Sequence, residues 1–211
     1  MKSAKSVKMP HETKSICVFC GASEIVDMHY IALAEETGMS IAKRGYRLVY
    51  GGGGIGLMGA SALSAHHAGG DVLGIIPKFL TEIEELLTEI EHRIVDDMHE
   101  RKLQMYQESD AFLVLPGGIG TLEEAIEIFS WMRLHLHTKP LVFLDTDGYW
   151  APLIALLTHT IDAKFTPAWV KGHLFRETNV ASALDLIEAQ WDSPAPKGNI
   201  QMSDVTGSKS V

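Results

Sequence analysis

Cysteine, basic residues and long apolar runs are all scarce in this sequence of 211 residues. Two cysteines cannot build the disulfide framework of a small secreted protein. Lysine and arginine number 18 against 27 acidic residues, and the net charge of −9 disfavours nucleic acid and anionic membranes as partners. No apolar run reaches the roughly 20 residues that cross a membrane, and the polar, lysine-rich start lacks the apolar segment of a signal peptide. We therefore expect a cytoplasmic protein in a reducing compartment.

The remaining composition is that of a globular protein, with 46% hydrophobic and 21% charged residues. The length favours a single domain with one large core. Residues 1–14 are predicted to be a disordered N-terminal arm, and residues 15–191 a single Rossmann-like nucleotide-binding catalytic domain. Residues 192–211 are rich in proline, glycine and serine, which predicts a disordered C-terminal tail.

Short apolar runs alternate with helical patterns along the predicted domain. Six or seven such runs are recognisable, which predicts an α/β fold: a Rossmann-like, doubly wound parallel sheet with helices on both faces. The clearest runs are Ile16–Phe19, Arg47–Tyr50, Val72–Ile76, Ala111–Leu115 and Leu141–Leu144. Ligands of such sheets bind beyond the carboxyl ends of the strands, where the strand order reverses.

The most informative stretch is Ala111–Phe129, which predicts a buried strand, a glycine loop and a helix. Glycines after Pro116 let backbone N–H groups approach an anion, and the helix N-terminus adds about half a positive charge. The helical period begins at Thr121, which is expected to cap the helix or offer its hydroxyl to a ligand. Glu123 and Glu124 stand in the first turn, where the helix dipole alone also favours acids.

A second glycine loop, Gly51–Gly59, follows the strand Arg47–Tyr50. It contains the G-x-G-x-x-G spacing of a dinucleotide site. Such a site needs an acid at the end of the next strand, and the nearest one, Asp71, stands at its beginning. A nicotinamide or flavin site therefore stays open as a minor alternative, and the same glycines can hold a mononucleotide.

Two further features have ordinary explanations. Cys17 and Cys20 form a C-x-x-C, but residues three apart on a strand face opposite sides and no further thiols are available. We expect structural cysteines, and no metal site. The acidic segment Phe79–Glu91 is expected to be a solvated helix or a lid.

Several blocks resemble one known family. Pro116-Gly-Gly-Ile-Gly-Thr-Leu-Glu-Glu124 fits the PGGxGTxxE motif of the LOG family, the cytokinin-activating nucleoside-5′-monophosphate phosphoribohydrolases that are often mislabelled lysine decarboxylases. Tyr50–Gly59 is similar to the family's YGGGxxGLMG block, and Met98–Lys102 to its M-H-x-R-K. The run Phe19–Ser23 matches the family's F-C-G-S-S except at Ala22. The resemblance covers about Ile16 to Trp191.

The resemblance implies two catalytic residues, Arg101 and Glu124. Glu124 would stabilise positive charge on the ribose and position or deprotonate water, and Arg101 would orient the nucleotide or assist the leaving base. Glu123 would hold ribose hydroxyls. The resemblance also implies a substrate-contacting glutamate near residues 79–91, but assigns no residue there. The implied substrate-binding set is Gly21, Ser23, Gly53, Gly54, Met98, Arg101, Lys102, Gly117, Gly118, Gly120, Thr121, Glu123 and Ser130, with Gly118, Gly120 and Thr121 on the phosphate.

The implied reaction is hydrolysis of the N-glycosidic bond of a purine nucleoside 5′-monophosphate, either AMP or a cytokinin nucleotide, to free base and ribose 5-phosphate. No cofactor is expected, and the resemblance suggests a homodimer. The alternative is a nucleotide-binding module that senses AMP-like ligands without catalysis. An amino-acid decarboxylase is a poor third interpretation, because the sequence has no S-x-H-K-like site for pyridoxal phosphate.

Overall fold

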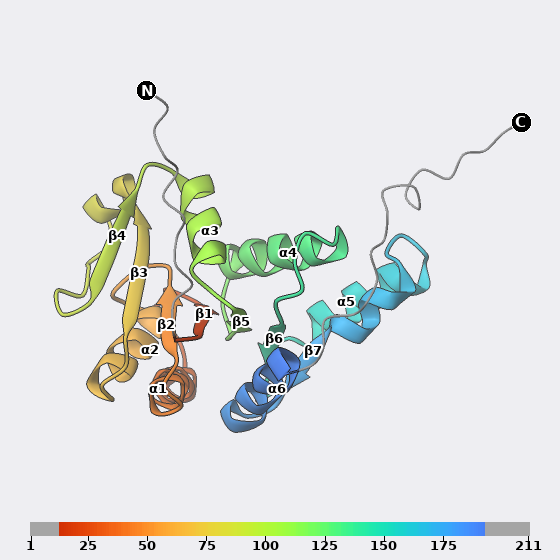
Figure 1. Ribbon diagram of the computed structural model, residues 1–211, viewed down its shortest axis with the longest axis horizontal. Coiled ribbons are helices and arrows are strands. Elements are labelled where there is room, and N and C mark those ends of the chain that lie inside the picture. Colours follow the sequence, from red (N-terminus) through yellow and green to blue (C-terminus); the bar gives the residue numbers. More distant parts are fainter. Residues whose placement is uncertain (1–12, 193–211) are drawn as a thin grey trace, which may run out of the picture.

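The computed structural model describes residues 13–192, and within them seven parallel strands form one sheet in the order β4-β3-β2-β1-β5-β6-β7 (Figure 1). This confirms the predicted parallel α/β sheet. The strands are β1 (Ser15–Phe19), β2 (Arg47–Tyr50), β3 (Val72–Pro77), β4 (Glu91–Val95), β5 (Ala111–Val114), β6 (Leu141–Leu144) and β7 (Phe175–Glu177).

Helices cover both faces of the sheet, as predicted for a doubly wound fold. On one face, side chains of α1 (Met28–Lys43), α2 (Gly56–His67) and α6 (Val180–Asp192) join the core. On the other, the helices are α3 (Met98–Gln107), α4 (Ile119–Arg133) and α5 (Ala151–Asp162). Short 3-10 helices span Lys78–Glu82 and Ala168–His173.

The central strands are apolar throughout because both of their faces are covered. Every residue of β1, β2 and β5 is buried. Along β1, alternate side chains enter opposite cores, so Cys17 and Cys20 lie in different clusters, and both are free thiols. The expectation that the two cysteines face opposite sides and are structural is confirmed.

The strand order reverses between β1 and β5. The chain runs from β1 outward through β2, β3 and β4, and then returns to pair β5 with the other edge of β1. The loops that follow β1 and β5 therefore leave the same edge of the sheet in opposite directions and open a crevice between them. Residues 20–27 and 115–118 form the two sides of this switch point.

Some predicted boundaries differ from the structure. Helix α4 begins at Ile119 with Gly118 as its N-cap, so Thr121 is not the cap. The acidic segment is a 3-10 turn and an irregular stretch, and Glu91 already belongs to β4. Residues 1–12 of the predicted arm and 193–211 of the predicted tail lie outside the described residues, while Lys14 forms an ion pair with Asp110. Among the helices of residues 13–192, none is both long and apolar enough to span a membrane.

Candidate active site

A crevice of 240 Å³ occupies the switch point, between the loops after β1 and β5. The two loops are joined where the Gly21 N–H donates to the Pro116 carbonyl at 3.1 Å. The Tyr149 hydroxyl donates to the Gly117 carbonyl at 2.8 Å and fixes the second loop from the β6–α5 side. The crevice therefore combines glycine backbone, which a small anionic ligand can approach closely, with apolar and tyrosine side chains. It is lined by Gly21, Ser23, Val26, Tyr30, Leu57, Pro116, Gly117, Gly118 and Tyr149.

The N-terminus of α4 stands at the rim of this crevice. Gly118, Ile119 and Gly120 are exposed. The first N–H groups of a helix have no partner within it, and they carry the positive end of the dipole. Thr121 is buried at 3% exposure with its hydroxyl against Gly117, so it supports the loop from below. The predicted phosphate loop thus exposes the backbone N–H groups at the start of α4, and the buried Thr121 side chain packs beneath it.

Two alanine substitutions separate the loop's fold from its ligand. A Cβ on Gly117 would overlap the Thr121 side chain and approach the Gly21 nitrogen to 2.8 Å, whereas a Cβ on Gly120 meets nothing within 4 Å. We expect Gly117→Ala to destabilise the protein by about 1–3 kcal/mol. We expect Gly120→Ala to keep the melting temperature and to raise the KM for a nucleotide about tenfold or more, because the methyl group occupies the ligand's space. Wild-type KM in Gly120→Ala would place the phosphate elsewhere.

The two predicted catalytic residues form a buried ion pair. Arg101 Nη1 donates to Glu124 Oε1 at 3.0 Å, and both residues are 8% exposed. Arg101 also donates from Nε to the Ile75 carbonyl and from Nη2 to the Gly51 carbonyl, both at 3.2 Å. The guanidinium thus connects α3 to α4, to β3 and to the loop that follows β2. Arg101 is therefore a buried base and not a solvated one on the surface of α3.

Glu124 lies in α4 behind the exposed glycines. Burial raises the pKa of its carboxyl group, and the Arg101 charge opposes that rise. A carboxylate that is desolvated yet held by a fixed guanidinium can accept a proton or stabilise a nearby positive charge. This is the environment expected of a catalytic acid or base rather than of a helix-start residue on the surface.

Lys102 points in another direction from Arg101, as neighbours on a helix do. Its ammonium contacts Glu123 Oε1 at 2.5 Å and Glu127 Oε2 at 3.0 Å. The Glu123 carboxylate is half-exposed, so it remains accessible to a ligand at the start of α4. The Lys102–Glu123 pair thus forms an outer layer beside the buried Arg101–Glu124 pair.

The structure also brings the acidic segment to the second glycine loop. A Cβ on Gly53 would collide with the Glu84 carboxylate, and the Gly54 N–H donates to the Glu85 carbonyl at 2.8 Å. Sequence reasoning assigned no residue in this segment. The signals were the number of acids between residues 79 and 91 and the glutamate that the resemblance implies there, and the fold was needed to show which of them faces the loop.

Other predicted residues lie further out. Ser23 is exposed at the crevice, and its hydroxyl accepts from the Ile25 N–H at 3.2 Å. Met98 is the first residue of α3 and is half-buried. Ser130 lies on the Glu123 side of α4, two turns and about 10 Å further along the helix axis. The structure therefore gathers the glycines, Arg101, Lys102, Thr121, Glu123 and Glu124, and leaves Ser130 at the margin.

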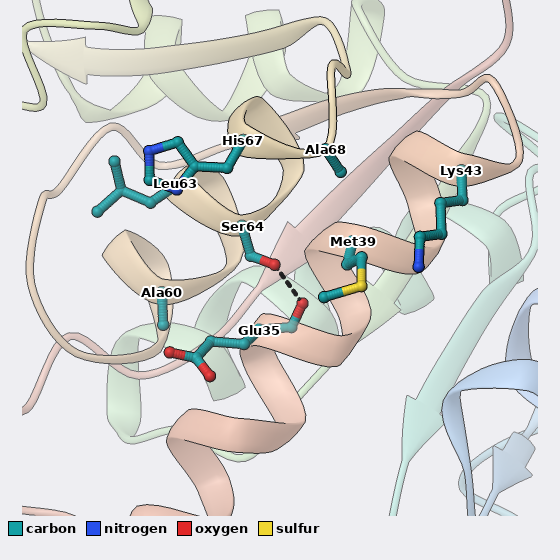
Figure 2. Close-up of a pocket in the computed structure, with 8 residues that line it drawn as sticks. All are labelled: Glu35, Met39, Lys43, Ala60, Leu63, Ser64, His67 and Ala68. Carbon is teal, nitrogen blue, oxygen red and sulfur yellow. Dashed lines mark hydrogen bonds between the residues drawn. The ribbon is translucent and has the colours of Figure 1, made fainter.

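A larger groove of 560 Å³ lies elsewhere, between α1 and α2 (Figure 2). Its residues run from the middle of each helix to its C-terminal end, and the Ser64 hydroxyl donates to the Glu35 carbonyl at 2.6 Å. Helices in this fold run opposite to the strands, so the groove is displaced toward the edge where strands begin. None of the predicted site residues lines it. Size alone therefore does not identify the ligand site.

Comparison with known proteins agrees with this geometry. The family model described as "Possible lysine decarboxylase" matches residues 58–187. Cytokinin riboside 5′-monophosphate phosphoribohydrolase LOG7 of Arabidopsis thaliana is 44% identical over 161 residues, 73% of either chain. The cytokinin riboside 5′-monophosphate phosphoribohydrolase of Rhodococcoides fascians is 45% identical over 160 residues, 74% of this chain and 80% of the relative.

Solved structures with the same fold are more distant in sequence. The molybdenum cofactor carrier protein of Chlamydomonas reinhardtii superposes with a TM-score of 0.65 at 20% identity, covering 86% of this chain and 100% of the other. The molybdenum cofactor binding protein of Rippkaea orientalis gives 0.64 at 21% identity, covering 85% and 98%. At such identity the likeness concerns the fold alone. By its sequence relatives, its glycine-loop motifs and its fold, the chain belongs to the LOG family.

Proposed function

We propose that this protein hydrolyses the N-glycosidic bond of cytokinin or purine nucleoside 5′-monophosphates, releasing the free base and ribose 5-phosphate. The observation that carries the proposal is the buried Arg101–Glu124 pair behind the exposed start of α4, in a chain that belongs to the LOG family. Relatives named as phosphoribohydrolases, at 44% and 45% identity, favour an enzyme over a non-catalytic sensor.

The phosphate binds at the N-terminus of α4. Gly117, Gly118 and Gly120 let it approach the backbone donors, and Thr121 holds the loop. On the other side of the crevice, Gly21 and Ser23 contact the phosphate or the ribose. This placement follows from the general affinity of helix N-termini and glycine loops for phosphate.

Glu124 performs the central chemical step. When the bond between C1′ and the base nitrogen breaks, the electron pair leaves with the base and positive charge develops on the ribose. The Glu124 carboxylate stabilises that charge and takes a proton from the water that adds to C1′. The base takes up a proton from solvent as it leaves, and Glu124 returns its proton to solvent, so one water is consumed for each bond broken. Arg101 orients the nucleotide and holds Glu124 in place through the 3.0 Å contact.

The outer residues position the sugar and the base. Glu123, held by Lys102, faces the ribose hydroxyls from the start of α4. Glu84, whose carboxylate lies against Gly53 of the second loop, supplies a third carboxylate at the site. Met98 and Ser130 then contact more distal parts of the substrate. Three carboxylates near one sugar suit a reaction whose transition state is cationic.

The rate should depend on pH in a definite direction. Glu124 acts as a carboxylate, and burial raises its pKa, so the active form is lost at a higher pH than for an ordinary glutamate. We expect kcat to fall on acidification with a midpoint above the ordinary value of about 4.3. Circular dichroism over the same range would exclude unfolding as the cause. A kcat that stays constant down to about pH 4.3 would contradict the role of Glu124.

The function is tested by incubating the purified protein with AMP and with N6-isopentenyl-AMP, without added cofactor, and resolving the products by chromatography. Free base and ribose 5-phosphate are expected, and the two rates rank AMP against the cytokinin nucleotide. Unchanged nucleotide together with measurable binding would support the sensor. Failure to bind either nucleotide would contradict the phosphate site itself.

A homodimer and a cytoplasmic location are further parts of this proposal. Several large apolar side chains around the site are exposed, including Ile94 at 59%, Leu103 at 46% and Ile119 at 84%. A second copy would cover such side chains. Cys17 and Cys20 are free thiols, which suits a reducing compartment. No cofactor or nucleic acid takes part in the proposed reaction.

A further inference from the structure

A histidine on the edge strand reaches across the sheet to the second glycine loop. Tyr50 of β2 pairs with Gly74 of β3, and Gly74 pairs with His92 of β4, so the three residues form one row. A Cβ on Gly74 would lie 2.6 Å from His92 Cδ2 and 3.1 Å from the Gly52 Cα. Because Gly74 has no side chain, the His92 imidazole can pass over it and contact Gly52 of the second glycine loop.

Both ring nitrogens of His92 face backbone carbonyls. Nδ1 lies 2.9 Å from the Ile90 oxygen, and Nε2 lies 3.1 Å from the Gly52 oxygen and 3.2 Å from the Tyr50 hydroxyl. Carbonyl oxygens only accept, and a neutral imidazole carries one N–H, so the ring donates either from Nδ1 to Ile90 or from Nε2 to Gly52. In the tautomer with the proton on Nε2, the contact to Gly52 is a hydrogen bond. Tyr50 is fully buried and burial raises its pKa, so its hydroxyl keeps its proton. That hydroxyl can donate to His92 Nε2 or accept from it.

His92 contacts the carbonyl of Gly52, and Arg101 donates to the carbonyl of the preceding residue, Gly51. Gly52 adopts a left-handed conformation with φ of 88°, and a Cβ there would lie 2.8 Å from Ile76 Cβ. The preceding Gly51 carbonyl accepts from Arg101 Nη2 at 3.2 Å. The Gly51 and Gly52 carbonyls belong to neighbouring peptide groups. A contact that holds the Gly52 carbonyl therefore also restrains the Gly51 carbonyl, which orients the Arg101 guanidinium.

We infer that His92 is a positioning residue for the reaction. Its Nε2–H holds the Gly52 carbonyl, the loop holds the Gly51 carbonyl, and Arg101 and Glu124 are thereby kept in their productive arrangement. His92 acts through the loop and does not touch the phosphate site on α4. The inference rests on the proposed function for its kinetic consequence, whereas the loop contact itself can be measured without turnover.

The kinetic test compares His92→Leu with His92→Gln. Leucine removes the donor, and we expect kcat to fall roughly tenfold, as for the loss of one hydrogen bond at a catalytic arrangement, while KM stays within about twofold. Glutamine places an amide N–H near the position of Nε2 and should restore most of the wild-type kcat. His67→Leu is the matched control, because His67 is an exposed histidine in the α1–α2 groove (Figure 2).

Hydrogen exchange separates the two ways in which this test can fail. The Gly54 amide is bonded to the Glu85 carbonyl, so exchange in a peptide covering residues 50–59 reports on the loop. We expect faster exchange there in His92→Leu than in His92→Gln or the wild type. A wild type without turnover would defeat the proposed function but leave this measurement valid. Unchanged exchange in His92→Leu, or equal kcat in the leucine and glutamine variants, would overturn the role of His92.

Discussion

Replacing Glu124 by glutamine is expected to lower kcat about 10²- to 10⁴-fold while the protein stays folded. Glutamine has the shape of glutamate, and its amide oxygen can still accept from Arg101 Nη1, which donates to Glu124 Oε1 at 3.0 Å in the unchanged protein. It cannot take a proton from water, and it carries no charge to stabilise a cationic ribose. Chromatographic assay of base release under saturating nucleotide measures the effect.

The control for Glu124→Gln is a carboxylate in a similar pair away from the site. Glu188 of α6 accepts from Arg44 Nη1 at 2.9 Å, and Glu188→Gln should leave kcat within about twofold. Thermal unfolding of both variants should follow the wild type within a few degrees. Near-wild-type turnover in Glu124→Gln would remove Glu124 from the mechanism.

Replacing Arg101 by lysine should lower kcat/KM about 100-fold, although the charge is retained. The guanidinium donates to Ile75, Gly51 and Glu124 at once, from nitrogens with fixed relative positions. An ammonium group cannot reach three acceptors spread over a strand, a loop and a helix. Some loss of stability, about 1–3 kcal/mol, accompanies the loss of buried hydrogen bonds. Steady-state kinetics and thermal unfolding measure the two effects separately.

Arg44→Lys is the matched substitution in the α1–α6 pair and should leave activity unchanged within about twofold. The double variant Arg101→Lys/Glu124→Gln gives a sharper result. Since the two side chains act as one unit, its loss should be much smaller than the product of the two single losses. Fully multiplicative losses would mean that the two residues work independently, against the 3.0 Å ion pair.

Much of the fold could be predicted because each strand and helix has a recognisable pattern within its own short stretch of sequence. Parallel strands buried on both faces must be apolar throughout, so runs such as Leu141–Leu144 are visible without any structure. Asp97 directly before α3 is a local signal of the same kind, because its carboxylate accepts from the N–H groups of His99 and Glu100 as the N-cap. Helix α4 was placed two residues late, because exposed Ile119 and Gly120 carry no apolar helical period.

The candidate site was predicted in part. Glycine loops after strands and acids at a helix start are local signals, and the resemblance added Arg101 and Glu124. Glu84 and Tyr149 carried no such signal, because their contacts with Gly53 and Gly117 join segments far apart in the chain. Lys102 pairs with Glu123 and Glu127 rather than with Glu100, a choice that depends on how α3 packs beside α4.

The sequence by itself determined the alternation of strands and helices, the glycine loop before α4 and the chemical types available to the site. Each of these depends on interactions within a few residues, such as strand burial, helix capping and glycine conformation. Only the tertiary structure decided that Arg101 is buried against Glu124, that Glu84 faces the second loop and that His92 reaches Gly52 over Gly74. These contacts cross from one strand or helix to another, and the distance between their residues along the chain does not reveal the distance in space.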